Sequence, residues 1–241
     1  MTPTTHANLP PTLLLDLDDT ILDDDGLADE CWTHITTRFA PQVAPVSAAE
    51  LLATVYRTRD WYWADAERNR VGRLNLKGAR RAVTTEALNK LGNTNPALVE
   101  QIASAYEARR ESAQRPLPGA LEALERLRAG GIRMGLITNG QAESQRSKVE
   151  RFHLADYFQV IVIEGEFGCG KPDERVYRHA LAALDAAPSE TWMVGDNLLN
   201  DVLAPQRLGL TGVWVNASGR EFPADVTERP ARIIRALREL I

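Results

Sequence analysis

The sequence predicts an α/β fold: a doubly wound, Rossmann-like and mostly parallel sheet as the core, with an all-helical cap domain inserted after the first strand. Two observations support this prediction. In residues 115–216, short apolar runs alternate with amphipathic stretches, which is typical of a parallel sheet covered by helices on both faces. In residues 26–113, helical stretches follow one another without a convincing strand.

Five apolar runs are predicted to be buried strands. The first, Thr12–Leu15, ends abruptly at acidic residues, as expected of a strand buried in a parallel sheet. The other four runs cover residues 132–137, 160–163, 192–194 and 212–215. Because ligands of doubly wound sheets bind beyond the carboxyl ends of the strands, we expect the functional residues to follow these runs.

The helices of the core are predicted from amphipathic stretches between these runs. Leu121, Leu124 and Leu127 recur at a spacing of three, and Gly130-Gly131 ends that helix. The predicted core helices cover residues 120–129, 141–152, 173–186 and 198–208.

The insert is predicted to contain four more helices. They are expected at about residues 26–40, 47–65, 75–91 and 96–112. The predicted domains are therefore an α/β core of residues 1–22 and 115–241 and a helical cap of residues 23–114.

The composition of the 241 residues limits the class of function. A net charge of −5 argues against binding of a nucleic-acid polymer, and no apolar run reaches the length of a membrane span. Two cysteines, Cys31 and Cys169, do not suggest a disulfide framework, and the N-terminus lacks the features of a signal peptide. We therefore expect a cytoplasmic monomer or homodimer that acts on a small molecule.

Asp16 and Asp18 are predicted to form a catalytic acid pair after the first strand. One carboxylate can attack phosphorus and form an acyl phosphate, while the other protonates the departing oxygen. This division of roles requires an ionised Asp16 and an Asp18 that can hold a proton. The alternatives are an acidic turn or a calcium loop, although Ile21 stands where a common calcium loop needs glycine.

Two further clusters suit the binding of phosphate. Thr138 and Asn139 combine a hydroxyl at the end of a strand with a flexible turn, although a plain strand-to-helix turn has the same pattern. Lys171 can balance the charge of a carboxylate and a phosphate. Residues 165–171 also fit most of a nucleotide-binding loop, but Pro172 stands where that loop needs serine or threonine.

Asp196 and Asp201, after the fourth strand, can supply or support oxygen ligands for Mg²⁺. The alternative is an ordinary helix N-cap. Taken together, the four clusters follow four strands of one predicted sheet, in the order acid pair, hydroxyl, lysine, acid pair. This order favours metal-assisted transfer of a phosphoryl group to a carboxylate.

The four clusters resemble the motifs of the haloacid dehalogenase superfamily of hydrolases. DLDDT is similar to the first motif DxDx[TV], ITNG to the second, GKP to the lysine motif and GDNLLND to the metal motif GDxxxxD. The resemblance implies that Asp16 is the nucleophile and that Asp18 is first the general acid and then the base. It also implies that Asp16, the backbone carbonyl of Asp18, and Asp196 hold Mg²⁺.

The same resemblance implies roles for the remaining motif residues. Thr138, Lys171 and the amide N–H of Asn139 would bind the phosphoryl group, and Lys171 would also pair with Asp16. Asp201 would support the metal or Lys171 from behind. The implied function is a Mg²⁺-dependent phosphomonoesterase that acts on a nucleotide or sugar phosphate through a phospho-aspartyl intermediate.

Three alternatives to this function stay open. A 2-haloacid dehalogenase resembles this chain, but such enzymes typically have tyrosine at the position of Asp18 and lack the acid at Asp196. A phosphomutase uses the same core, and a catalytically inactive binding module would have lost catalytic acids. Turnover of p-nitrophenyl phosphate with and without Mg²⁺ separates these classes.

The predicted cap is rich in aromatic residues and arginine between residues 56 and 81. Most of the arginines suit a solvated helix face, but Trp61 and Trp63 cannot share one helical face. We therefore expect Trp61, Trp63 and Arg73 to bind substrate. Residues 115–158 are similar to those of pyrimidine 5′-nucleotidases and N-acylneuraminate-9-phosphate phosphatases, a similarity that lies outside the predicted cap.

Overall fold

The computed structural model describes residues 9–241 and divides the chain into two compact units. The core unit comprises the residues up to Asp23 together with Arg115–Ile241, and the helical unit is Asp24–Gln114. None of the helices within residues 9–241 is long and apolar enough to span a bilayer. The first eight residues, on which the expectation about a signal peptide rests, lie outside the described part.

The core unit is built on a six-stranded sheet in which every neighbouring pair of strands is parallel. Its strands are β1 (Thr12–Leu15), β2 (Arg133–Thr138), β3 (Val160–Ile163), β4 (Thr191–Gly195), β5 (Thr211–Val215) and β6 (Arg232–Ile234). The strand order is β3-β2-β1-β4-β5-β6. This order reverses direction between β1 and β4, so the carboxyl ends of these two strands form the switch point where doubly wound sheets bind ligands.

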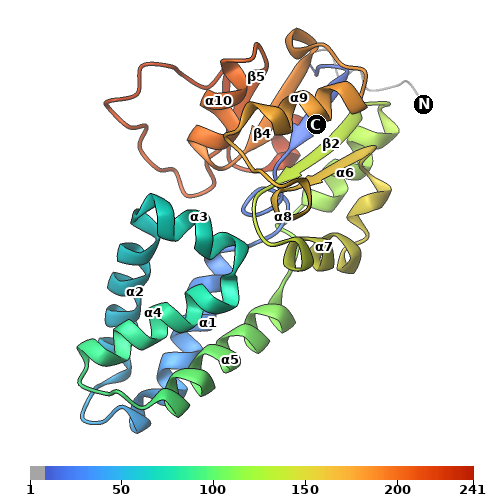
Figure 1. Cartoon of the computed structure of the whole chain (residues 1–241). Coiled ribbons are helices and arrows are strands. Elements are labelled where there is room, and N and C mark those ends of the chain that lie inside the picture. The colour runs from blue at the N-terminus through green and yellow to red at the C-terminus, as the bar shows by residue number, and fades with distance from the viewer. Residues whose placement is uncertain (1–8) are drawn as a thin grey trace. The chain divides into compact units, whose positions relative to one another are not determined.

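Helices pack on both faces of this sheet, as Figure 1 shows. Leu13 and Leu15 of β1 point to the face covered by α6 and α7, whereas Leu14 points to the face covered by α9 and α10. This alternation follows from the two-residue period of a strand.

The helical segments of the core are α6 (Ala120–Ala129), α7 (Ala142–Arg151), η2 (Leu154–Asp156), α8 (Glu164–Phe167), α9 (Glu174–Ala183), η3 (Pro188–Glu190), the π-helical segment η4 (Leu198–Leu203), α10 (Ala204–Gln206) and η5 (Leu237–Leu240). The predicted doubly wound fold is confirmed.

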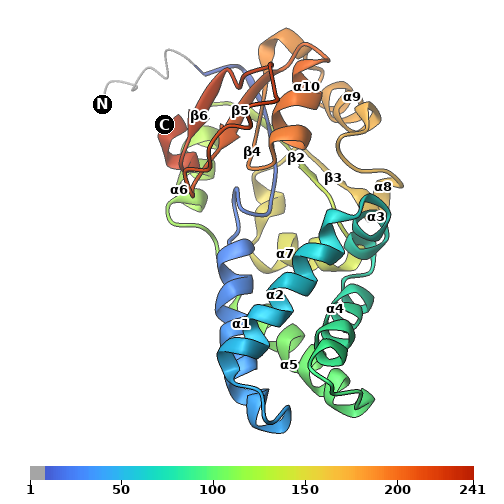
Figure 2. The ribbon, with the colours of Figure 1, turned by 90° about the vertical axis from the view of Figure 1, so that its left-hand side faces the viewer.

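The helices of the helical unit, drawn as ribbons in Figure 2, enclose a hydrophobic core of their own. Its segments are α1 (Asp25–Phe39), η1 (Ala40–Gln42), α2 (Ala48–Ala64), α3 (Ala66–Leu74), α4 (Leu76–Lys90) and α5 (Pro96–Ala113). The helix α1 packs against α2 and α5, and α4 packs against the same two helices. Within this core, the ring of Trp32 stacks on that of Tyr106 with 4.0 Å between their centroids.

The sequence did not predict the helix α3 or the strand β6. The helix α3 occupies a region predicted as a helix end and a break, because Asp65 accepts a hydrogen bond from the backbone N–H of Arg68 and so starts a new helix. Asn75 caps α4 in the same way. The strand β6 has three residues, two of them exposed, so it lacks the apolar run that identified the other strands.

The two chain segments that leave and re-enter the core are paired with each other on the core side. The backbone N–H of Asp23 donates to the carbonyl of Arg115 over 3.1 Å, and the guanidinium of Arg115 lies 2.7 Å from the carboxylate of Asp23. The N–H of Leu117 donates to the carbonyl of Ile21 over 2.8 Å. These bonds fix both ends of the insert close to the segment that follows β1.

Candidate active site

Five of the predicted site residues meet at the carboxyl ends of the strands. Asp16 directly follows β1, and its N–H donates to the carbonyl of Val194 in β4 over 2.9 Å. Thr138 is the last residue of β2, and Asp196 directly follows β4. Lys171 lies in the connection between α8 and α9, and Asp201 lies in η4. Lys171 contacts the carboxylates of both Asp16 and Asp201, which brings these residues to the same place.

Lys171 lies between two carboxylates in the interior of the core. Its Nζ is 2.7 Å from Oδ1 of Asp16 and 2.6 Å from Oδ1 of Asp201, and all three residues are buried. Burial alone lowers the pKa of the Lys171 ammonium, but the carboxylates of Asp16 and Asp201 outweigh burial and raise it above its usual value. Lys171 is therefore a fixed positive charge beside the predicted nucleophile.

Asp201 is held as a supporting group. Its Oδ1 accepts from Lys171, and its Oδ2 accepts from the backbone N–H of Asn197 over 3.0 Å. A Cβ atom on Gly195 would lie only 2.3 Å from the Asp201 carboxylate, so a glycine is needed there for this close approach. These contacts hold Asp201 against Lys171, and its expected support of the metal or of Lys171 stays a prediction.

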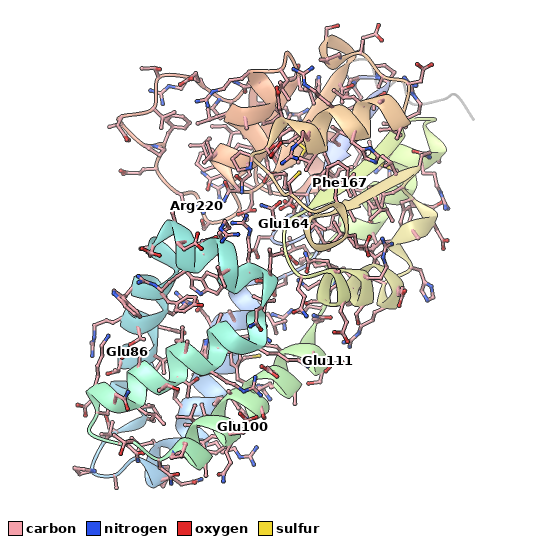
Figure 3. The ribbon with its side chains drawn as sticks, in the orientation of Figure 1. Glu86, Glu100, Glu111, Glu164, Phe167 and Arg220 are labelled. Carbon is pink, nitrogen blue, oxygen red and sulfur yellow. The ribbon has the colours of Figure 1, made fainter. Side chains whose placement is uncertain are left out.

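Asn139 lies beside Lys171 and fixes the segment that carries it. The Oδ1 of Asn139 accepts from the N–H of Lys171 and its Nδ2 donates to the carbonyl of Lys171, both over 2.7 Å. The next turn is held by Glu164, labelled in Figure 3, whose Oε2 accepts from the N–H of Gly140 over 2.9 Å. The side chain of Asn139 thus positions the lysine, and the expected contact of its backbone N–H with phosphate stays a prediction.

Asp18 is held by two side chains from α7. Lys148 Nζ lies 2.7 Å from Oδ1 of Asp18, and Gln145 Nε2 lies 2.9 Å from Oδ2. Gln145 Nε2 also donates to Oγ1 of Thr138 over 2.6 Å. Neither Gln145 nor Lys148 was predicted from the sequence, because on an amphipathic helix both read as ordinary polar residues.

Asp196 is held by the segment around β5. Trp214 Nε1 donates to the carbonyl of Asp196 over 2.8 Å, and Arg220 Nη2 donates to the same carbonyl over 3.0 Å. Arg220, labelled in Figure 3, also lies 3.4 Å from Oδ2 of Asp196. No motif in the sequence marks Trp214 or Arg220 as partners of the site.

The carboxylates of this site suit a divalent cation. One oxygen each from Asp16, Asp196 and Asp201 lies within 4.8 Å of the others. Burial and, to a smaller extent, the negative charges of Asp16, Asp201 and Asp19 together raise the pKa of Asp196 to about 8, against the opposing effect of Arg220. Burial likewise raises the pKa of Asp16 to about 6, against the effect of Lys171. A cluster of hard oxygen atoms with excess negative charge has the donor set that Mg²⁺ takes, so the residues present fit the predicted metal.

The three residues expected to bind substrate in the helical unit have different surroundings. Trp61 is half-exposed with the Arg68 guanidinium 4.0 Å from its ring, and Arg73 donates to Asn69 over 3.2 Å. A pocket of about 460 Å³ lies within this unit, and among the described residues its lining includes Trp63 but neither Trp61 nor Arg73. Of the three expected residues, Trp63 is the one that lines this pocket.

That pocket brings aromatic rings together with guanidinium groups. Its lining includes Trp32, Tyr106, Arg59, Arg80 and Arg110. Arg59 and Arg110 form ion pairs with aspartates, whereas Arg80 lies 5.5 Å from the Tyr106 ring and forms no ion pair among residues 9–241. Burial lowers the pKa of Arg80. The sequence did not single out Arg80 from its many neighbouring arginines.

Residues 10–209 match the family model of the haloacid dehalogenase-like hydrolases. The chain belongs to this family. The expected enzyme class, a hydrolase with phosphatase relatives, is therefore confirmed.

Relatives of this haloacid dehalogenase-like hydrolase include two bacterial enzymes. The chain is 32% identical over 245 residues to the phosphoserine phosphatase of Thermus thermophilus, covering 95% of this chain and 96% of that one. It is 33% identical over 180 residues to the pyrimidine 5′-nucleotidase YjjG of Escherichia coli, covering 74% and 75%. The expected similarity to pyrimidine 5′-nucleotidases and N-acylneuraminate-9-phosphatases is confirmed, the latter by the mouse enzyme at 36% identity over 110 residues, 45% of this chain and 44% of that one.

The fold of this family member is also found in solved structures. The HAD-hydrolase YfnB from Bacillus subtilis, solved with bound magnesium, superposes with a TM-score of 0.75 over 97% of both chains at 22% identity. At this level of identity the likeness shows the fold alone.

Proposed function

We propose that this enzyme is a Mg²⁺-dependent phosphomonoesterase that acts on a small phosphorylated metabolite through a phospho-aspartyl intermediate. The observation that carries the proposal is the buried contact between Lys171 and Asp16, with Asp18 two residues further along the chain. Lys171 opposes the effect of burial on Asp16, so the pKa of Asp16 is about 6 and its carboxylate is ionised near neutral pH. It therefore has an anionic oxygen for attack on phosphorus.

The first step forms a bond from Asp16 to phosphorus and breaks the ester bond. One carboxylate oxygen of Asp16 attacks the phosphorus, and the electron pair of the broken P–O bond goes to the leaving oxygen. The carboxyl group of Asp18 donates its proton to that oxygen, so the product leaves as a neutral alcohol. Lys171 and Thr138 hold the phosphoryl oxygens as charge develops on them.

The second step returns the enzyme to its starting state. Asp18, now a carboxylate, takes a proton from a water molecule while the water oxygen attacks phosphorus. The bond between phosphorus and Asp16 breaks, which releases inorganic phosphate and the free Asp16 carboxylate. Mg²⁺, held by Asp16, the backbone carbonyl of Asp18 and Asp196, would supply positive charge that offsets the repulsion between the phosphate and these acids.

The relatives named above act on phosphorylated amino acids, nucleotides and acylneuraminates, and we place the substrate of this enzyme within that range of small phosphate esters. Its identity depends on the helical unit, where Trp63 and Arg80 line the pocket. With only two cysteines in its sequence, Cys31 and Cys169, the enzyme is proposed to act in a reducing compartment such as the cytoplasm.

The test is turnover of p-nitrophenyl phosphate and of a panel of phosphate esters, each with Mg²⁺ and after chelation. Phosphate release that requires Mg²⁺ supports the proposal. Halide release from 2-haloacids without metal would instead indicate a dehalogenase, and isomerisation of a sugar phosphate without phosphate release would indicate a mutase. Tight binding without turnover of any of these would indicate a binding module.

A further inference from the structure

Both carboxylate oxygens of Asp18 are engaged by α7. Gln145 and Lys148 are three residues apart and therefore share one face of this helix. Lys148 Nζ lies 2.7 Å from Oδ1 of Asp18, and Gln145 Nε2 lies 2.9 Å from Oδ2. A carboxyl group held at both oxygens has a fixed orientation, unlike one that turns freely about its side-chain bonds.

Lys148 and Asp18 differ in their exposure to solvent, as expected if Lys148 supports an acid that must reach a substrate. The side chain of Lys148 is 7% exposed, whereas that of Asp18 is 28% exposed. The supporting residue thus lies inside the core, and the carboxyl group it supports remains accessible to a small molecule.

Gln145 links this acid to the phosphate-binding hydroxyl. Its Nε2 lies within hydrogen-bond distance of both Asp18 Oδ2 and Thr138 Oγ1, at 2.9 and 2.6 Å. The position of Asp18 is therefore set relative to the group that is proposed to hold the phosphoryl oxygens. Such a link matters because proton transfer requires the acid to be within hydrogen-bond reach of the leaving oxygen.

We propose that Gln145 and Lys148 are positioning residues that hold the carboxyl group of Asp18 in place for transfer of a proton to the leaving group and from water. The inference rests on the proposed function, in which Asp18 carries that proton. Gln145 and Lys148 neither gain nor lose a proton in either step. They act through the orientation of Asp18.

The inference is tested with two esters that need a proton to different degrees. An alkyl phosphate such as glycerol 2-phosphate releases a poor leaving group and depends on protonation, whereas p-nitrophenyl phosphate releases a stable anion. Lys148→Met should lower kcat for the alkyl ester by about 10²-fold, within the usual contribution of general acid catalysis, and lower it for p-nitrophenyl phosphate by less than about tenfold. KM should change little, and Lys148→Arg, which keeps a charged donor, should recover part of the loss.

Arg146→Met is the matched control. Arg146 lies on the same helix and forms an ion pair with Glu166 at 2.6 Å, but on the surface. Its loss removes a cation and an ion pair without touching Asp18, so the ratio of the two ester activities should stay that of the parent enzyme.

A double-mutant cycle shows whether Lys148 acts through Asp18. In an Asp18→Asn background, Lys148→Met should add little further loss on the alkyl ester, because the acid that it positions is gone. Equal losses on both esters, or full additivity of the two substitutions, would overturn the inference. If thermal unfolding shows that Lys148→Met does not fold, Gln145→Leu and Lys148→Arg are put through the same cycle.

Asp18→Asn by itself separates this inference from the proposed function. A selective loss on the alkyl ester in Asp18→Asn but not in the Gln145 and Lys148 variants overturns the positioning role alone. Equal loss on both esters in Asp18→Asn overturns the acid role of Asp18, and the positioning role with it.

Discussion

The core buries ion pairs at its candidate site, whereas the helical unit carries most of its ion pairs on its surface. In the core, Lys171 is buried between Asp16 and Asp201, and Lys148 is buried against Asp18. In the helical unit most ion pairs lie on the surface; Arg81, for example, pairs with Glu100 at 2.7 Å with both side chains well exposed. Burial of a charge is unfavourable unless it is paired, and exposed pairs contribute little. The buried pairs therefore indicate where the fold has been shaped by function.

The largest expected effect concerns the predicted nucleophile. Asp16→Asn should lower turnover by at least about 10³-fold while the fold stays intact, because an amide has no anionic oxygen to attack phosphorus but has nearly the same size. Steady-state kinetics and circular dichroism on the purified variant check this. Near-normal activity in a folded Asp16→Asn protein would show that Asp16 is not the nucleophile.

The difference between buried and exposed pairs can be measured directly as stability. Lys171→Met leaves Asp16 and Asp201 buried without their shared cation, and it should lower the free energy of unfolding by about 3 kcal/mol or more. Arg81→Met breaks an exposed pair and should leave the denaturation midpoint almost unchanged. Equal destabilisation by the two variants in urea unfolding would contradict this comparison.

The acidic cluster predicts a dependence of stability on pH. The pKa of Asp196 rises from 3.8 to about 8 and that of Asp16 to about 6. Between the ordinary and the raised values the folded state binds more protons than the unfolded state, so the stability of the metal-free protein should fall as pH rises from about 4 to about 8. Mg²⁺ should raise the Tm more at pH 8 than at pH 5.

Asp196→Asn is the control for that experiment. It removes the group with the higher pKa, so stability of the metal-free variant should fall less between about pH 6 and pH 8, and the response to Mg²⁺ should be lost or much reduced. A Tm of the metal-free parent that is flat or rises through this window would show that these carboxylates do not titrate as described.

The smallest expected effects are those of the helical unit. Trp63→Ala and Arg80→Ala remove groups that line the pocket, and each should raise KM for the best natural-type ester by roughly tenfold, about 1.4 kcal/mol, with little effect on p-nitrophenyl phosphate. Trp61 and Arg73 do not line this pocket, so Trp61→Ala and Arg73→Ala should change little either the KM for the natural-type ester or the activity on p-nitrophenyl phosphate. Larger effects from Trp61→Ala than from Trp63→Ala would show that the pocket is not the specificity site.

The sequence predicted those site residues of the core that lie at the ends of strands. The sheet fixes the backbone there, so few positions remain for a carboxylate or hydroxyl that comes directly after an apolar run. Asp16, Thr138 and Asp196 lie where that reasoning places them. The partners that hold them could not be predicted in this way. Lys148 and Arg220 reach the site from a helix face and a loop, and their contacts depend on how distant segments pack.

The helical unit shows the same limit more strongly. Trp61 and Trp63 have different environments: the Arg68 guanidinium lies over the Trp61 ring, and the Trp63 ring contacts Tyr62. The sequence could predict that they face different ways, because this follows from helical geometry alone. Which of them lines a pocket depends on the packing of α1, α4 and α5, and no local pattern encodes that packing. For the same reason the sequence could not distinguish Arg80 from the arginines that form surface ion pairs.

The central claim, that Asp16 attacks phosphorus, is tested most directly by trapping the intermediate. The enzyme is mixed with Mg²⁺ and a phosphate ester, quenched within the first turnover and reduced with borohydride, which converts an aspartyl phosphate to homoserine. Peptide mass spectrometry should then find homoserine at position 16 in the parent enzyme and none in Asp16→Asn. Phosphate release in the first turnover with unmodified Asp16, or with the label at another carboxylate, would contradict the account.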